Sequence, residues 1–95
     1  MMGAMLRIRR SEGKGYAIFA LSGRIEEKDL AELQALLDAE AKATEVTLDL
    51  ADLKLVDREA IRFLAACEAR RIGLKDCPAY VRRWIEEGSD VQHDP

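Results

Sequence analysis

The feature that most constrains the fold of this chain is a change of hydrophobic period between residues 46 and 67. Apolar and polar residues alternate over residues 46–50, which is typical of a β-strand with one buried face. Over residues 60–67 the apolar residues instead recur three and four positions apart, as on one side of a helix. Asp57 lies between these segments and suits a helix N-cap, because its carboxylate accepts a hydrogen bond from an unpaired amide of the first turn. Together with the alternating strands and helices expected before and after these segments, this order predicts a partly parallel sheet.

The first half of the chain extends this pattern. Residues 6–10 alternate like a strand near the edge of a sheet, and residues 11–15 supply a turn. Residues 16–21 are apolar in both alternating sets, as in a strand covered on both faces, so the two strands are expected to form a hairpin that ends at Gly23. After Asp29 the spacing predicts a helix, whose apolar side consists of Leu30, Leu33, Leu36, Leu37 and Ala41.

The last part of the chain predicts a short strand and a third helix. Gly73 is expected to end the second helix, after which residues 73–75 leave room for a strand, and Pro78 fits the first position of a helix. Along that helix Val81, Trp84 and Ile85 share a face, Arg82 and Glu86 are spaced for an exposed ion pair, and Gly88 is a plausible stop. We therefore expect one domain over residues 1–88 and a flexible tail over residues 89–95.

Length and charge narrow the classes of protein. A chain of 95 residues with 48% apolar side chains can bury one hydrophobic core but not two. Charged residues of both signs are interspersed and the formal net charge is −3, which argues against a nucleic-acid ligand. No apolar run reaches the ~20 residues of a membrane span, and the start lacks the apolar stretch of a secretory signal. We expect a cytoplasmic protein that does not insert into a membrane.

The segment LDLADLKLVDREAI, at residues 48–61, resembles the pattern L-D-L-S-x-V-x-x-I-D-S-[ST]-G-[LI] of the STAS family. This is the domain of bacterial anti-sigma-factor antagonists, and it also occurs at the ends of sulfate transporters. The segment LSGRI, at residues 21–25, is similar to the family's L-x-G-x-[IL], and residues 73–74, Val81 and Ile85 fit its last strand and helix. The resemblance covers residues 5–87 and implies an α/β domain with a mixed sheet of about four short strands, an opening β-hairpin and three or more helices.

The chain departs from that family at its regulatory switch. The family carries a phosphorylatable serine or threonine in the pair after the aspartate, and here the pair is Arg58 and Glu59. Neither side chain accepts a phosphoryl group as a hydroxyl does, so no phosphorylation is expected in this loop. Binding at the same surface remains open, and the candidate protein-interaction residues are Asp57, Arg58, Glu59 and Arg62. Asp57 and Glu59 either only cap the helix and complement its dipole, or Glu59 also mimics a phosphate.

The remaining candidate residues favour structural roles. Phe63, Tyr80 and Trp84 are expected to pack in the core or between helices, whereas an exposed Trp84 would suggest an interface anchor. Cys67 falls on an apolar stripe and is expected to be inert, and Cys77 near a helix start is not expected to have a redox role. His93 has no surrounding cluster of metal-ligating residues, so no metal site is predicted.

The sequence shows no phosphate-binding glycine loop and no nucleophile elbow, so we expect neither catalysis nor a cofactor. The leading hypothesis is a non-catalytic regulatory or scaffold module that binds an anti-sigma kinase, a related STAS-like domain or its own copy as a homodimer. The alternative is a soluble accessory subunit of a membrane transporter of the lipid-transport type. A small-molecule or nucleotide binder ranks last, because neither phosphate-cradling glycines nor an aromatic cluster is present.

Overall fold

Within residues 6–92, the sheet of this protein contains four strands that lie side by side in the order of the sequence. The computed structural model describes the backbone of residues 6–92 and the side chains of residues 6–87. The strands are β1 (Arg7–Gly13), β2 (Tyr16–Ile25), β3 (Glu45–Val56) and β4 (Gly73–Lys75), and only the β1–β2 pair is antiparallel. The helices are α1 (Leu30–Asp38), α2 (Arg58–Ala69) and α3 (Ala79–Gln92), with a short 3-10 turn η1 (Glu27–Asp29) before α1. The α/β class, the hairpin and the mixed sheet are as predicted.

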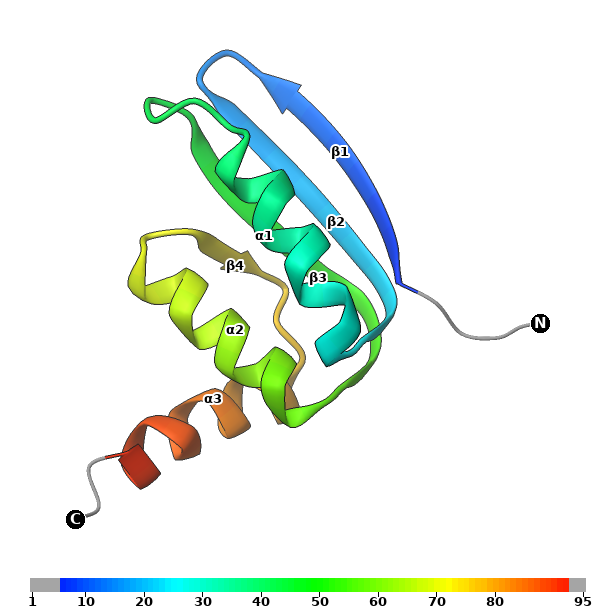
Figure 1. Ribbon diagram of the computed structural model, residues 1–95, viewed down its shortest axis with the longest axis vertical. Coiled ribbons are helices and arrows are strands. Elements are labelled where there is room, and N and C mark those ends of the chain that lie inside the picture. The colour runs from blue at the N-terminus through cyan, green and yellow to red at the C-terminus, as the bar shows by residue number, and fades with distance from the viewer. Residues whose placement is uncertain (1–5, 93–95) are drawn as a thin grey trace.

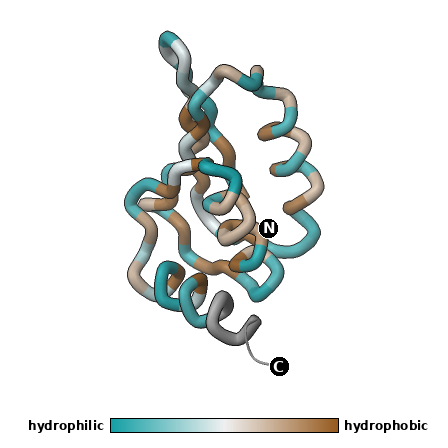
Figure 2. Tube along the Cα trace, turned by 90° about the vertical axis from the view of Figure 1, so that its left-hand side faces the viewer, coloured by the Kyte–Doolittle hydropathy of each residue, from teal (hydrophilic) through white to brown (hydrophobic). Residues whose placement is uncertain are grey.

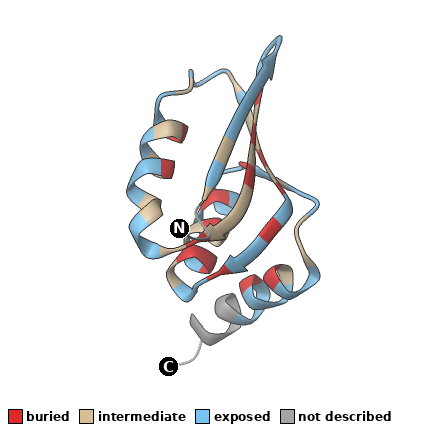
Figure 3. Cartoon of the chain, turned by 90° about the vertical axis from the view of Figure 1, so that its right-hand side faces the viewer, coloured by how far each residue is buried: buried red, intermediate tan, exposed pale blue. Residues whose placement is uncertain are grey.

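Helices α1 and α2 cover the same face of the sheet (Figure 1). The two crossovers, from β2 to β3 and from β3 to β4, advance across the sheet in one direction with their helices on one face, and both have the right-handed sense that parallel strands favour (Figure 1). The face beneath α1 and α2 is called the covered face below, and the opposite one the open face. Helix α3 packs against α2 at one end of the sheet, as Figures 1 and 3 show.

The hydrophobic core lies between the covered face and the helices. Figure 2 shows hydrophobic positions recurring along the strands and helices, and Figure 3 shows buried positions on the side of α1 that faces the sheet. The larger buried side chains come from every layer of the fold: Phe19, Leu21, Ile25, Leu33, Leu48, Leu50, Leu64, Val81 and Ile85. Burial of this apolar surface, at roughly 25 cal/mol per Å², is the main force that holds the layers together.

Strand β3 keeps its apolar residues on the covered face by bulging. Its buried residues are Leu48, Leu50, Leu53 and Val56, so the spacing changes from two to three residues along the strand. The pairing with β2 shifts at the same places, because Ala20 pairs with Asp49 and Ser22 with Asp52, and a second shift follows at Gly23. Each shift adds a residue to β3, which turns the next apolar side chain back toward the core. The predicted strand at residues 46–50 is therefore the first part of a longer one.

Two glycines explain errors in the predicted strand ends. The hairpin turn is Lys14 and Gly15, where Gly15 has φ +78°, so residues 11–13 of the expected turn instead extend β1. Gly23, at φ +92°, does not end β2 but lies inside it at the second register shift, and the strand continues to Ile25. A left-handed backbone conformation can thus mark a bulge as well as a turn.

The helix ends also differ from prediction. Helix α1 ends at Asp38, so Ala41 is exposed in the following loop. Helix α2 ends without Gly73, because Arg71 takes the left-handed conformation at φ 71°. The amides of Arg71 and Ile72 then donate to the carbonyls of Glu68 and Cys67, both at 3.0 Å, which is the Schellman arrangement. Gly73 begins β4 instead.

Helix α3 passes through Gly88 and continues to Gln92, so the predicted stop at Gly88 is wrong. The domain boundary at residue 88 and the flexible tail stay predictions, and residues 93–95 lie outside the described residues. None of the helices found within residues 6–92 has both the length and the apolar character required to cross a bilayer.

Candidate functional site

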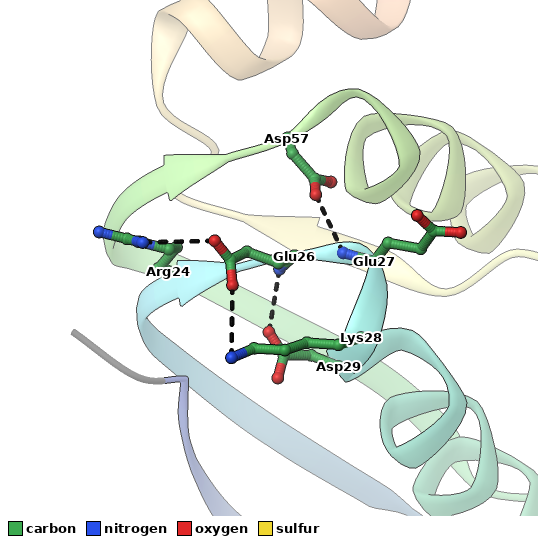
Figure 4. Close-up of polar contacts among 6 residues, drawn as sticks. All are labelled: Arg24, Glu26, Glu27, Lys28, Asp29 and Asp57. Atoms are coloured by element: carbon green, nitrogen blue, oxygen red, sulfur yellow. Dashed lines mark hydrogen bonds and ion pairs between the residues drawn. The ribbon is translucent and has the colours of Figure 1, made fainter. Parts of the chain in front are cut away.

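Asp57 joins two loops at the end of the sheet where β2 and β3 finish. Its Oδ1 accepts a hydrogen bond from the amide of Ala60 at 2.9 Å, which confirms the predicted N-cap of α2. Its Oδ2 accepts a second bond from the amide of Glu27 at 2.9 Å, as Figure 4 shows. The Asp57 amide donates to the carbonyl of Ile25 at 3.2 Å. One side chain therefore fixes the start of α2 and the loop before α1 against each other.

The other three predicted interaction residues lie on the first turns of α2, beside this cap. Arg58 and Arg62 are exposed, and Glu59 is half-buried. The Glu59 Oε2 lies 3.8 Å from Nη1 of Arg62, an ion pair between residues three positions apart. The structure thus brings all four predicted residues together, with Asp57 bonded into the fold and both arginines facing solvent.

A polar cluster on the neighbouring β2–α1 loop escaped the sequence analysis (Figure 4). The carboxylate of Glu26 lies 3.3 Å from Nη1 of Arg24 and 3.7 Å from Nζ of Lys28. The amide of Glu26 donates to Oδ2 of Asp29 at 2.9 Å, which stabilises the turn η1. The signal in the sequence was the spacing of Glu26 and Asp29, an acidic residue three positions before another at a helix start.

The structure contradicts the expectation that Trp84 packs in the core. Trp84 is 51% exposed, although Val81 and Ile85 of the same helix are buried as predicted. Tyr80 is also exposed, and its hydroxyl donates to the carbonyl of Lys54 on β3 at 3.2 Å. Leu55, the next residue of β3, is 54% exposed. Phe63, in contrast, packs against the core as expected.

Helix α3 makes a different ion pair from the one predicted. Nη1 of Arg82 lies 2.9 Å from Oε1 of Glu68 on α2 and does not pair with Glu86. This hydrogen bond from Arg82 lowers the pKa of Glu68, and the same contact raises the pKa of Arg82. The pair ties α3 to α2, which positions Tyr80 beside the end of β3.

The cysteines differ in their surroundings. Cys67 is buried in the core, and burial raises the pKa of its thiol to about 11. Cys77 is half-buried, and burial raises the pKa of its thiol as well. A raised pKa keeps a thiol protonated and therefore slow to react, because the thiolate is the nucleophile. His93 lies outside the described residues, and within residues 6–92 no group of three or more His, Cys, Asp or Glu side chains is placed to hold a metal ion.

No model of a known protein family matches this chain, and no curated protein matches it either. The STAS resemblance rests on the residues quoted above, and family membership stays a prediction. The fold and the geometry of the Asp57 loop are the observations from which function is argued.

Proposed function

We propose that this chain is a non-catalytic regulatory or scaffold module that binds a protein partner through the start of α2. The binding surface consists of Asp57, Arg58, Glu59 and Arg62. In this proposal the chain works like the anti-sigma-factor antagonists it resembles, but without their phosphorylation switch, because Arg58 and Glu59 replace the hydroxyl residues.

The observation that carries the proposal is the division of roles at this loop. Asp57 accepts hydrogen bonds from the amide of Ala60 in the first turn of α2 and from the amide of Glu27 in η1, so the first turn of α2 is fixed in position. Arg58 on that turn and Arg62 on the next turn are exposed. A rigid backbone that presents free side chains loses little conformational entropy on binding, which favours recognition.

Exposed apolar and aromatic side chains occur at the end of β3, before this loop, and on the start of α3, which is bonded to β3. Leu55 lies two residues before Asp57 on β3, and Tyr80 is hydrogen-bonded to Lys54. Trp84 follows Tyr80 by one helical turn and is half exposed. Arginine and large aromatic residues are the types most often found at the energetic centre of protein interfaces. Their exposure here supports a protein partner rather than a small ligand.

Charge indicates which groups on the partner would bind. The start of a helix carries a partial positive charge, and Arg58 and Arg62 add two cationic side chains to it. Glu59 neutralises part of the positive charge of Arg62 through their ion pair. We therefore infer that carboxylate groups of the partner contact Arg58 in particular, with the planar guanidinium offering a bidentate contact.

Affinity capture from the native cell, followed by mass spectrometry, tests the proposal when it is run with paired variants. The double variant Arg58→Glu/Arg62→Glu should lose more than about 90% of the specifically captured protein, since charge reversal places like charges opposite each other. Lys42→Glu in the α1–β3 loop, at the other end of the sheet, is the matched control and should retain it. Equal capture by both variants would refute the proposed surface. Sigma-factor or kinase proteins among the captured set indicate regulation, and permease or ATPase subunits indicate the transporter role.

The role of Glu59 as a phosphate mimic requires a separate test. If Glu59 contributes a phosphate-like charge, Glu59→Ser changes the affinity for the captured partner more than tenfold, about 1.4 kcal/mol. If Glu59 only complements the helix dipole, affinity is unchanged and stability falls by less than about 1 kcal/mol. Calorimetric titration and chemical denaturation of the same variant separate the two roles.

A further inference from the structure

The open face of the sheet carries walls of opposite charge on either side of a shallow groove. The floor of the groove consists of two small residues of β2, Ala20 and Ser22. The strand register places Arg9 and Asp49 on either side of Ala20, and Arg7 and Asp52 on either side of Ser22. The groove has a volume of about 490 Å³. One wall, on β1, is therefore cationic, and the other, on β3, is anionic.

The charges on this face differ from the charge on the other side of the same strand. Arg10, which alternates with Arg9 and faces the helices, lies 2.8 Å from carboxylate oxygens of both Glu12 and Glu40. Among residues 6–87, no ion pair is formed by Arg7, Arg9, Asp49 or Asp52. Arg7 and Arg9 are separated from the two aspartates by the whole of β2, roughly 10 Å between backbones. Within residues 6–87, the structure supplies carboxylate partners for Arg10 and none for Arg7 and Arg9.

The neighbouring side chains do not change this pattern. Asp49 accepts one hydrogen bond, from the amide of Ala51 at 3.1 Å, which leaves its other oxygen available. Lys75 of β4 is next to Asp49 in the register but forms no ion pair with it in the described residues, and it lies at the outer edge of the anionic wall. Ile18, on the same face of β2, is only half-buried. The face thus combines complementary charges with a small apolar centre.

A second copy of the chain satisfies these charges under one symmetry only. If two open faces stack around a twofold axis parallel to β2, strand β1 of each copy lies over β3 of the other, and arginines meet aspartates. If the axis is perpendicular to the strands, β1 lies over β1, and arginines meet arginines. Self-association of a surface requires that it be complementary to itself under the twofold operation. The charge pattern is complementary to itself when the twofold axis is parallel to β2. It is repulsive when the axis is perpendicular to the strands.

We propose that the open face binds a second copy of this chain around the axis parallel to β2. Arg9 of each copy pairs with Asp49 of the other, and Arg7 pairs with Asp52. Ala20 and Ser22 lie at the axis, where small side chains let two sheets approach to the usual spacing of about 10 Å. Because α2 lies on the far side of each sheet, both copies leave Arg58 and Arg62 exposed, and the dimer presents its partner-binding surface twice.

Reversing the charge of one wall at a time tests this arrangement by analytical ultracentrifugation. Variant A is Arg7→Asp/Arg9→Asp, and variant B is Asp49→Arg/Asp52→Arg. When two copies of the same variant associate, like charges face each other in both halves of the interface. The dissociation constant of that dimer should therefore rise more than about 100-fold. In an equal mixture, the Asp residues on β1 and β3 of variant A face the Arg residues on β3 and β1 of variant B across the interface. A heterodimer should therefore form, with an affinity within about tenfold of that of the wild-type dimer.

The proposal is overturned by a wild type that stays monomeric up to millimolar concentration, by variants that dimerise as well as wild type, or by a mixture of A and B that stays monomeric. Circular dichroism melting of each variant checks that it is folded. The variant with all four reversals keeps the complementarity with the signs exchanged and should dimerise like wild type, so its failure while folded also counts against the proposal. If Arg7 and Arg9 instead paired with Asp49 and Asp52 of the same copy, mixing variants A and B would produce no heterodimer. The control Lys42→Asp should dimerise normally.

Discussion

The two faces of the sheet use alternate residues of the same strands for different purposes. Phe19 and Leu48 lie on the covered face and are fully buried. Their neighbours Ile18 and Asp49 lie on the open face and are half-buried. On β1 the division is one of charge, since within residues 6–87 Arg10 has carboxylate partners and Arg9 has none. A strand has a period of two, so each face can change without altering the other. The covered face therefore encodes the fold, and the open face is free to encode binding.

The largest expected effect compares neighbouring residues on β2. Phe19→Ala removes a fully buried ring from the core and should lower the free energy of unfolding by about 3–5 kcal/mol. Ile18→Ala, on the open face, should cost less than about 1.5 kcal/mol, because Ile18 is only half-buried. Urea denaturation at low micromolar protein measures both. Similar losses in the two variants would mean that the open face is part of the core.

An intermediate effect is expected where Asp57, in the loop between β3 and α2, is compared with Asp49 on the open face. Asp57→Ala leaves the amides of Ala60 and Glu27 without their acceptor and should cost about 1–3 kcal/mol. Asp49→Ala loses one bond, to the exposed amide of Ala51, and should cost less than about 1 kcal/mol. Chemical denaturation of both variants gives the comparison. If Asp57→Ala is no more costly than Asp49→Ala, the joining of the two loops contributes nothing to stability.

The smallest effect concerns the arginines of β1. The Arg10 guanidinium, by its hydrogen bond, lowers the pKa of Glu40 below its usual range. A folded-state pKa below the unfolded value contributes stability that is present at neutral pH and is lost as pH falls through the folded pKa. Arg10→Ala should raise the pKa of Glu40 toward its ordinary value, and the loss of stability at acidic pH that this carboxyl group causes should disappear. NMR titration of the carboxyl groups measures the pKa.

Arg9→Ala, on the other face of the strand, is the control for that titration and should leave Glu40 unaffected. An equal shift of the Glu40 pKa in both variants would indicate a general effect of net charge and not the contact with Arg10.

The candidate site could be predicted from local chemistry where its interactions are local. The N-cap at Asp57 involves an amide three residues away, so sequence spacing alone indicated it, and the structure confirms it. The second bond of Asp57, to Glu27, joins residues 30 positions apart. No local pattern contains such a contact. The same holds for Arg82, whose partner Glu68 lies on another helix, while the local candidate Glu86 was predicted wrongly.

The sequence by itself determined the order of strands and helices, the opening hairpin and the mixed sheet, because hydrophobic period is a local property. Only the tertiary structure decided the bulges of β3, since its buried residues recur at a spacing of three that a regular strand does not have. It also decided that Trp84 is exposed, because α3 buries Val81 and Ile85 in the core and leaves Trp84 of the same apolar stripe in solvent. The opposing charge walls likewise exist only because strand register places Arg9 and Asp49 in one row. Pairing of distant strands is a property of the folded chain, and a pattern along the sequence does not contain it.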